Sequence, residues 1–151
     1  MSKRPKLLAV ASGGGHWVQM LRLEPIFAQY EVVFATVDQG YGFELGGRRL
    51  LTINDATRWN KLALLRLAFR LLRIIVVERP DAIISTGAAP GFLAIRIGRL
   101  LGVRTIWLDS IANAERLSLS GLRVGPYADL WLTQWPHLAR PGGPHYAGSV
   151  L

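Results

Sequence analysis

The sequence predicts an α/β fold built on a Rossmann-like, doubly wound parallel sheet. Three observations favour it: short apolar runs alternate with longer helical patterns, glycine-rich turns follow two of these runs, and the longest helical pattern stops just before Pro80. Strands that alternate with helices in this way form a parallel sheet. A chain of 151 residues, half of them hydrophobic, suffices for one such domain. We therefore expect a single domain over residues 1–151.

Each element has a local sequence signal. Apolar runs predict strands at residues 7–12, 31–37, 50–53, 82–86, 104–108 and 129–133. Proline and glycine delimit the predicted helices at residues 16–24, 59–78 and 92–101. Pro25 would stop the first helix, Pro80 follows the second, and Gly102 would close the third in the C′ position.

The remaining segments are predicted to be irregular. Residues 38–49 hold four glycines and predict a flexible loop, and residues 87–91 predict a tight turn. Short helices and turns are expected over 111–128, and residues 136–148 form a segment rich in proline and glycine.

Composition excludes several functions. The absence of cysteine excludes disulfides, thiolate metal sites and cysteine nucleophiles, and the three histidines lack metal-ligand spacing. We therefore expect no metal and no cofactor. Residues 7–11 are too short for a signal sequence, which needs roughly 7–15 apolar residues. No window reaches the roughly 18 apolar residues of a spanning helix, so we expect a cytoplasmic protein, soluble or peripheral to a membrane.

The ligand crevice of an open parallel sheet lies beyond the carboxyl ends of its strands. Four short segments follow the predicted strands and are rich in small or polar residues: 12–16, 85–91, 109–110 and 133–135. This concentration, beside strands that are themselves apolar, is the main functional signal in the sequence.

The first segment contains Gly13, Gly14 and Gly15, followed by His16. Glycines allow positive φ and close approach to a ligand, and a helix start offers N–H groups to a phosphate. The spacing matches neither a dinucleotide fingerprint nor a P-loop. His16 would act as a base toward a sugar hydroxyl, or hold a diphosphate when protonated. The alternative is a tight turn with an ordinary residue at the helix start.

The later segments supply further candidate ligands. Thr86, Gly87 and Gly91 repeat the glycine-rich arrangement, and two such turns on one crevice suit a diphosphate better than a single phosphate. Otherwise both turns only connect elements. Asp109, beside Ser110, either holds sugar hydroxyls or caps the following helix; Glu115 is the other carboxylate near the crevice. No pair of carboxylates has a spacing that indicates glycoside hydrolysis.

The positive charge is concentrated on one part of the chain. Lys and Arg exceed Asp and Glu by 18 to 10, and residues 60–104 carry six of the eight net charges. At about 100° per residue, Arg66, Arg70 and Arg73 share one stripe of the 59–78 helix, and apolar residues cover roughly 220° of its circumference. Packing needs only about 100°, so apolar residues such as Phe69 would stay exposed beside the arginines.

Such a helix suits an anionic membrane surface. The alternative is that a partner subunit or the chain's own loops cover it. Nucleic acid is a poorer fit, because the basic residues lie among aliphatic side chains and no recognition motif is present.

An ordered set of short motifs resembles a known family. They are SGGGH at 12–16, MLRL at 20–23, STG at 85–87, ERLSLSG at 115–121, AD at 128–129 and QWP at 134–136. Together they resemble the bacterial PssD/CpsF/EpsE-type exopolysaccharide glycosyltransferase subunits. These are similar to the membrane-anchoring subunit of the eukaryotic UDP-N-acetylglucosamine transferase that acts on dolichol diphosphate.

The resemblance implies the N-terminal, acceptor half of a split GT-B glycosyltransferase, distantly like MurG. Such a subunit would sit on the cytoplasmic face of the inner membrane and hold a polyprenyl-diphosphate-sugar acceptor. A small partner subunit would bind the UDP-sugar and supply the donor lobe. By the same resemblance, Gly13–His16 would lie near the acceptor diphosphate, and Glu115 would belong to a second signature. The eukaryotic members also carry an N-terminal spanning helix with no counterpart in residues 1–151, so attachment would fall to residues 59–78.

Two hypotheses about function follow, beside a third that we do not favour, a free-standing Rossmann domain that binds NAD or UDP by itself. In the first, the chain takes part in an inverting sugar transfer and is inactive without its partner. In the second, it is a non-catalytic recruiter that tethers a complete partner enzyme to the membrane. The sugar is left open by the resemblance, which allows glucuronic acid, N-acetylglucosamine, galactose or glucose.

Overall fold

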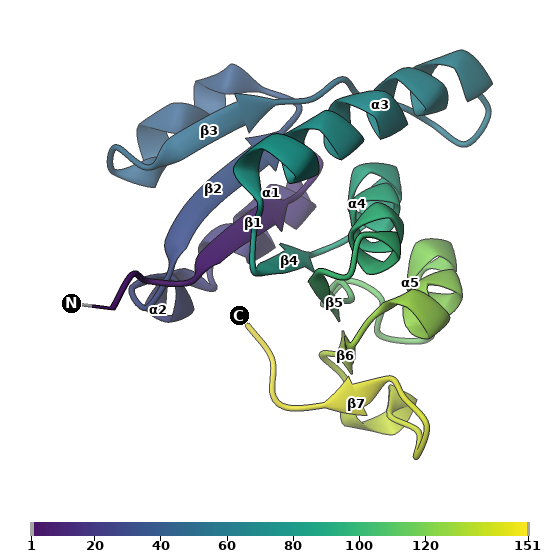
Figure 1. The fold of residues 1–151 in the computed structure, drawn as a ribbon. Helices are drawn as coiled ribbons and strands as arrows, with labels where there is room; N and C mark the ends of the chain where they lie inside the picture. Colours follow the sequence, from purple (N-terminus) through teal and green to yellow (C-terminus); the bar gives the residue numbers. More distant parts are fainter. Residues whose placement is uncertain (1, 151) are drawn as a thin grey trace.

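All seven strands of the sheet run parallel in the computed structural model, which describes residues 2–150 (Figure 1). The strands are β1 Lys6–Val10, β2 Glu31–Thr36, β3 Arg49–Thr52, β4 Ala82–Ser85, β5 Arg104–Leu108, β6 Leu130–Thr133 and β7 His145–Tyr146. Their order across the sheet is β3-β2-β1-β4-β5-β6-β7. The order reverses between β1 and β4, and in such sheets this switch point is where ligands bind. The Rossmann-like, doubly wound fold predicted from the sequence is confirmed.

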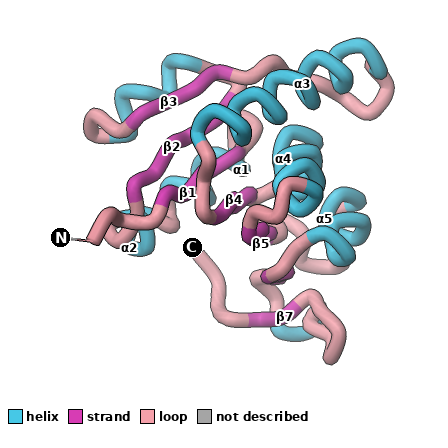
Figure 2. The backbone as a smooth tube through the Cα atoms, viewed as in Figure 1, coloured by secondary structure: helices cyan, strands magenta, loops and turns pink. Residues whose placement is uncertain are grey.

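Helices cover both faces of the sheet (Figures 1 and 2). One face carries α3 Lys61–Glu78, α4 Ala88–Leu100 and α5 Leu119–Val124, and the other carries α1 Gly15–Leu21 and α2 Glu24–Phe27. Three short 3-10 helices complete the fold: η1 Gln39–Leu45, η2 Gly125–Tyr127 and η3 Pro136–Leu138.

Side chains of β1 alternate between the two hydrophobic cores, as the period of a strand requires. Leu8 and Val10 belong to the core under α3 and α4, whereas Leu7 and Ala9 belong to the core under α1. All four are buried. From Leu7 to Val10 the central strand is therefore apolar, and at the carboxyl edge of the sheet polar groups gather beyond its end.

The helix α3 has a defined start and end. The side chain of Asn60 caps its N-terminus by accepting a hydrogen bond from the Ala63 N–H at 3.0 Å. Glu78 ends the helix and is buried, bound to Lys6 Nζ at 2.9 Å and Arg49 Nη1 at 2.8 Å. These two ion pairs attach the last turn to β1 and β3. None of the helices described over residues 2–150 is long and apolar enough to cross a bilayer.

The predicted glycine stop of α4 is confirmed. Gly102 has φ +76°, the Val103 N–H donates to the Gly98 carbonyl at 2.9 Å, and the Gly102 N–H donates to the Arg99 carbonyl at 3.2 Å. This pair of bonds is a Schellman motif, which satisfies carbonyl groups at the helix end.

Several expectations about local structure were wrong. Pro25 does not simply end a helix but lies in the first turn of α2, where its missing N–H costs nothing. Residues 38–49 are not a flexible loop throughout, because η1 forms there with Asp38 accepting from the Gly40 N–H at 2.7 Å. The turn predicted at 87–91 is helical from Ala88 onward. The glycine-rich tail contains β7, a strand of two residues with no periodicity to reveal it.

Candidate functional site

The four segments predicted to line the crevice do follow parallel strands at one edge of the sheet. They leave β1 and β4, which flank the switch point, and β5 and β6, which follow β4 in the sheet. Direct hydrogen bonds join the first segment to the second and, through α1, to the third and fourth. The site is therefore assembled from residues up to 115 positions apart in the chain.

His16 and Thr86 form a reciprocal pair between the two glycine-rich turns. The His16 Nδ1 lies 3.0 Å from the Thr86 carbonyl oxygen, and the Thr86 hydroxyl donates to the His16 carbonyl oxygen at 2.6 Å. A carbonyl only accepts, so Nδ1 must carry the proton of this bond. In the neutral imidazole, Nε2 is then the atom with a free lone pair. Within residues 2–150, no hydrogen-bond partner is recorded for Nε2.

Gly87 makes room for this imidazole. A Cβ on Gly87 would lie 2.5 Å from the His16 Nδ1 and would also overlap Cε1. Its φ of +141° is, in addition, one that side-chain-bearing residues rarely adopt. Gly87 thus has a steric role toward His16, which the sequence pattern alone did not show.

The start of α4 is strained and lacks a side-chain cap. Ala88 has φ +63°, in the left-handed region, which costs a non-glycine residue about 1–2 kcal/mol. Gly87 stands at the N-cap position, and among residues 2–150 no side-chain hydrogen bond caps this helix start. Strain of this kind is typical of functional turns, and here it lies next to the His16–Thr86 pair.

Gly91 has a packing role in the structure. It is buried in α4, and a Cβ there would overlap the Ser85 hydroxyl. The Ser85 hydroxyl in turn accepts from the Gly87 N–H at 3.2 Å. Gly91 therefore lets α4 approach β4, and its small size is explained without contact to a ligand.

The triple glycine forms the open side of the site. Gly14 and Gly15 are exposed, a Cβ at either position would meet no atom within 4 Å, and Gly14 has φ +65°. The Gly14 N–H donates to the Tyr41 hydroxyl at 3.1 Å, and the Tyr41 ring stacks on Trp17 with 5.0 Å between centroids. Tyr41 of η1 thus holds the turn from the β2 side and was not anticipated as part of the site.

Asp109 is buried and fully engaged. Its side chain is 1% exposed and accepts four hydrogen bonds. The donors are Trp107 Nε1 at 3.1 Å, Asn113 Nδ2 at 3.2 Å, the Ser118 N–H at 3.1 Å and the Ser118 hydroxyl at 2.7 Å. This geometry favours neither sugar contact nor a simple helix cap. It indicates that the carboxylate orders the loop between β5 and α5.

A buried pair of glutamines connects α1 to the ends of β5 and β6. The Gln134 amide donates to Gln19 Oε1 at 2.6 Å and to the Asp109 carbonyl at 3.0 Å. Gln19 donates to the Ser110 hydroxyl at 2.8 Å and accepts from the Ile111 N–H at 3.1 Å. Sequence reasoning missed Gln19. Its signal was a polar residue three positions after His16, among the apolar residues of a short helix.

Two further candidates, Ser110 and Glu115, separate in the structure. Ser110 is buried beneath the crevice in the glutamine network, whereas Glu115 is exposed on the following loop. Ser110 is therefore a supporting residue in this geometry. Glu115 remains open to a ligand or a partner.

The structure corrects the prediction that three arginines form one exposed stripe along α3. Exposed apolar side chains follow one another at helical spacing: Leu62, Leu65, Phe69, Leu72 and Val76. Arg66 and Arg73 are exposed beside them. Arg70 is half-buried instead, because its Nε donates to the Thr52 carbonyl at 3.2 Å. We call the five apolar residues with Arg66 and Arg73 the α3 face.

The fold is shared with MurG and with UDP-N-acetylglucosamine 2-epimerases. MurG from Acinetobacter baumannii superimposes with a TM-score of 0.77 at 16% identity, over 97% of this chain and 46% of that one. UDP-N-acetylglucosamine 2-epimerase from Rickettsia bellii gives a TM-score of 0.68 at 12% identity, over 89% and 40%. At these identities the likeness shows the fold alone: one Rossmann-like lobe, about half of a MurG chain.

The relatives found by sequence similarity carry a more specific name than the structural neighbours do. The chain is 28% identical to the UDP-N-acetylglucosamine transferase subunit ALG14 of Eremothecium gossypii, over 84% of this chain and 71% of that protein. It is 36% identical to ALG14 of Yarrowia lipolytica, over 45% and 34%. No family model matches the chain. The Yarrowia match spans about a third of that relative, so the activity of the whole protein is carried over only as a proposal.

Proposed function

We propose that this chain is the membrane-associated, acceptor-side subunit of a two-component glycosyltransferase. The complex would transfer a sugar from a UDP-sugar to a polyprenyl-diphosphate-linked acceptor during exopolysaccharide or capsule synthesis. The observation that carries this proposal is the His16–Thr86 pair, which joins two glycine-rich turns at the switch point. The similarity to ALG14 subunits over 84% of the chain supports the class of reaction.

The geometry of His16 suits either of two roles. With Nδ1 donating to the Thr86 carbonyl, a neutral ring has its lone pair on Nε2. In that state Nε2 takes the proton of the acceptor hydroxyl as its oxygen attacks the anomeric carbon, and the bond from that carbon to UDP breaks. In the protonated state, Nε2 donates to a diphosphate oxygen. The orienting bond at Nδ1 serves both roles.

The donor side belongs to a partner in this proposal. The relative that matches 84% of this chain is named as a subunit of a UDP-N-acetylglucosamine transferase, which supports a separate small subunit that carries most of the UDP-sugar site. The open glycine turn, with Gly14 and Gly15 exposed, faces the space that such a lobe would cover. We expect the isolated chain to be inactive.

The α3 face is the proposed membrane contact. Phe69 is 64% exposed and Leu62 is 72% exposed, on a helix that also presents Arg66 and Arg73. Apolar side chains would enter the boundary of an anionic inner membrane from its cytoplasmic face, while the guanidinium groups bind lipid phosphates. The acceptor would then be reached from the bilayer surface.

The experiment is a sugar-transfer assay on membranes containing this chain and its co-expressed partner. His16→Ala removes the imidazole, His16→Gln keeps a donor but no base, and His145→Ala is the control, because His145 is exposed on β7. Loss in both His16 variants indicates a base. Rescue by His16→Gln indicates a phosphate ligand.

Two outcomes would contradict the proposal. Unchanged transfer in both His16 variants would remove this residue from the reaction. Full activity of the partner alone on a soluble acceptor would show that the chain is a non-catalytic recruiter instead.

A further inference from the structure

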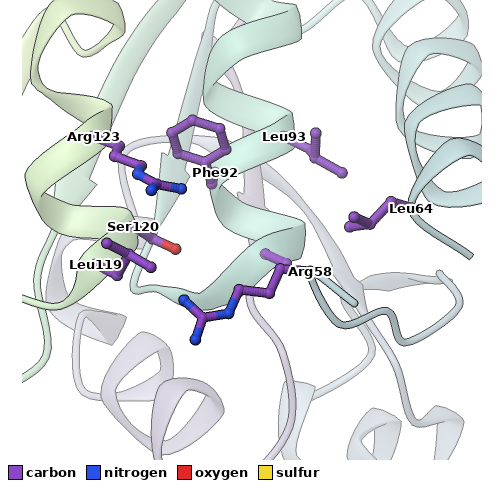
Figure 3. A pocket seen from close by; sticks show the side chains of 8 residues that line it. Arg58, Leu64, Phe92, Leu93, Leu119, Ser120 and Arg123 are labelled. Atoms are coloured by element: carbon purple, nitrogen blue, oxygen red, sulfur yellow. The ribbon is translucent and has the colours of Figure 1, made fainter. Parts of the chain in front are cut away.

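A cavity of about 200 Å³ opens between α3, α4 and α5, next to the 85–91 segment (Figure 3). Three helices and the loop before α3 contribute its lining: Arg58, Leu64, Ala89, Phe92, Leu93, Leu119, Ser120 and Arg123. Ala89 lies in the first turn of α4, two residues after Gly87. The cavity is therefore next to the proposed diphosphate region, and Leu119 and Ser120 of its lining come from the motif at 115–121.

The polar part of the cavity is cationic. In Figure 3 the guanidinium groups of Arg58 and Arg123 lie on either side of the Ser120 hydroxyl. No acidic residue lines the cavity, and neither arginine belongs to an ion pair recorded within residues 2–150. The Arg58 guanidinium also lies over the Trp59 ring, 4.6 Å from its centroid. Two arginines that line one cavity without a carboxylate favour a phosphate-bearing ligand, because guanidinium groups bind phosphate oxygens in pairs of hydrogen bonds.

The other part of the cavity is apolar. Leu64 and Leu93 lie together away from the guanidinium groups in Figure 3, and Phe92 lies beside Arg123. The Phe92 ring is held edge-on to Tyr127 with 6.3 Å between centroids. A cavity of about 150 Å³ accommodates benzene, so this one suits roughly five to ten carbon atoms. That is the size of one or two isoprene units.

The cavity also opens toward exposed apolar surface. Leu119 on its rim is 43% exposed, and Leu122 in the same short helix is 55% exposed. Leu64 comes from the first turn of α3, whose next turns carry the α3 face. A hydrocarbon chain that leaves the cavity past α5 would therefore meet the apolar side chains of Leu119 and Leu122.

We propose that this cavity binds the lipid end of the acceptor: the first isoprene unit or units of a polyprenyl diphosphate. Arg58 and Arg123 hold the diphosphate, and Leu64, Phe92 and Leu93 surround the branched hydrocarbon. This inference rests on the proposed function and adds to it a site for the lipid. A sugar is a poorer occupant, because the apolar part offers no partners for hydroxyl groups.

Binding of farnesyl diphosphate, a short isoprenoid diphosphate, tests the inference directly by titration calorimetry on the intact chain. We expect it to bind at least about tenfold more tightly than pyrophosphate or farnesol, since each of these lacks one half of the ligand. The double variant Arg58→Gln, Arg123→Gln should weaken binding by about tenfold or more. Arg104→Gln, at an exposed position at the start of β5, is the matched control and should leave binding unchanged.

A second variant tests the apolar part. Ala89→Leu places a larger side chain in the cavity and should weaken farnesyl diphosphate binding while leaving pyrophosphate binding unaffected. Ala147→Leu, at an exposed position of the tail, is its control. Equal affinity of wild type and both cavity variants for farnesyl diphosphate would overturn the inference.

Vesicles of phosphatidylglycerol separate this site from general membrane attraction. The Arg58, Arg123 variant should bind them nearly as well as wild type. If it loses vesicle binding but keeps farnesyl diphosphate, the two arginines contact the bilayer surface and the inference is wrong. Intact farnesyl diphosphate binding together with no sugar transfer by the assembled complex would count against the proposed function alone.

Discussion

The imidazole Nδ1 of His16 lies 3.0 Å from the carbonyl oxygen of Thr86, 70 residues further along the chain. This contact joins the end of β1 to the end of β4 across the switch point of the sheet. It also determines which ring nitrogen is free, because a carbonyl can only accept a hydrogen bond. The orientation of His16 is thus set by a backbone group, and Gly87 beside it provides the space.

Substitution of Gly87 should displace His16 without abolishing the fold. The Cβ of Gly87→Ala would overlap the imidazole, and φ is +141° at this position. We expect a loss of about 1–3 kcal/mol in the free energy of unfolding and a fall in transfer activity comparable to that of His16→Ala. Urea denaturation and the transfer assay measure the two effects.

Gly102→Ala is the matched control for the backbone effect. Gly102 also has a positive φ, but a Cβ there would meet nothing within 4 Å. It should lose about 1 kcal/mol in stability and keep full transfer activity. If both variants lose activity equally, contact with His16 is not the cause.

Asp109 should matter for stability more than for ligand binding. Asp109→Ala would leave four donors without their acceptor in a buried loop. We expect a loss of about 3–5 kcal/mol, as for removal of one partner from a buried charged network. Glu115→Gln, at an exposed position, should change the free energy of unfolding by less than about 0.5 kcal/mol. A stable Asp109→Ala variant that fails only in acceptor binding would contradict the structural role.

Much of the fold could be predicted because local signals coincide with element ends. Pro80 and Gly102 marked helix ends, and the apolar runs marked the strands. The same signals failed where a residue type serves two purposes. Pro25 is as favourable in the first turn of one helix as it is at the end of another, and its sequence position does not distinguish the two.

The site could be predicted only as a set of segments. Strand ends in a parallel sheet must share one edge, so the four segments could be grouped without coordinates. The role of each side chain depends on neighbours that periodicity cannot reveal. Gly91 is small because Ser85 faces it, and Asp109 is occupied because Ser118 turns back toward it.

In the basic helix α3 too, the sequence predicts the positions of the side chains but not their neighbours. Helical spacing placed Arg66, Arg70 and Arg73 on one stripe, and they do lie on neighbouring turns of α3. Spacing gives no information about which edge of the stripe meets the sheet. Arg70 lies at that edge and donates to the Thr52 carbonyl, whereas the other two are exposed.

The arginines of α3 should therefore separate into two groups. Arg66→Gln with Arg73→Gln should weaken binding to anionic vesicles by roughly thirtyfold, at about 1 kcal/mol per arginine, with little change in stability. Arg70→Gln should lose less vesicle binding and more stability, because its hydrogen bond to Thr52 is removed. Vesicle sedimentation at low and physiological salt measures the first effect. Equal loss of vesicle binding in the three single variants Arg66→Gln, Arg70→Gln and Arg73→Gln would contradict this division.

The two buried glutamines should act as one unit. Gln19→Leu removes the acceptor of the Gln134 amide and of the Ile111 N–H, and it removes the donor to Ser110. We expect a loss of about 2–4 kcal/mol and faster amide hydrogen exchange over residues 109–118. Gln29→Leu, at an exposed position after α2, is the control and should change neither.

A double-mutant cycle makes this prediction quantitative. Once Gln19→Leu is present, the Gln134 amide has already lost one acceptor, so Gln134→Leu removes a group that is no longer fully bonded. Replacing both partners of a buried hydrogen bond by apolar groups costs less than the two single changes together. We therefore expect the double variant to be more stable than the sum of single losses predicts, by about 1 kcal/mol or more. Strict additivity would show that the two side chains stabilise the edge of the sheet independently, and that α1 is not coupled to β6 through this pair.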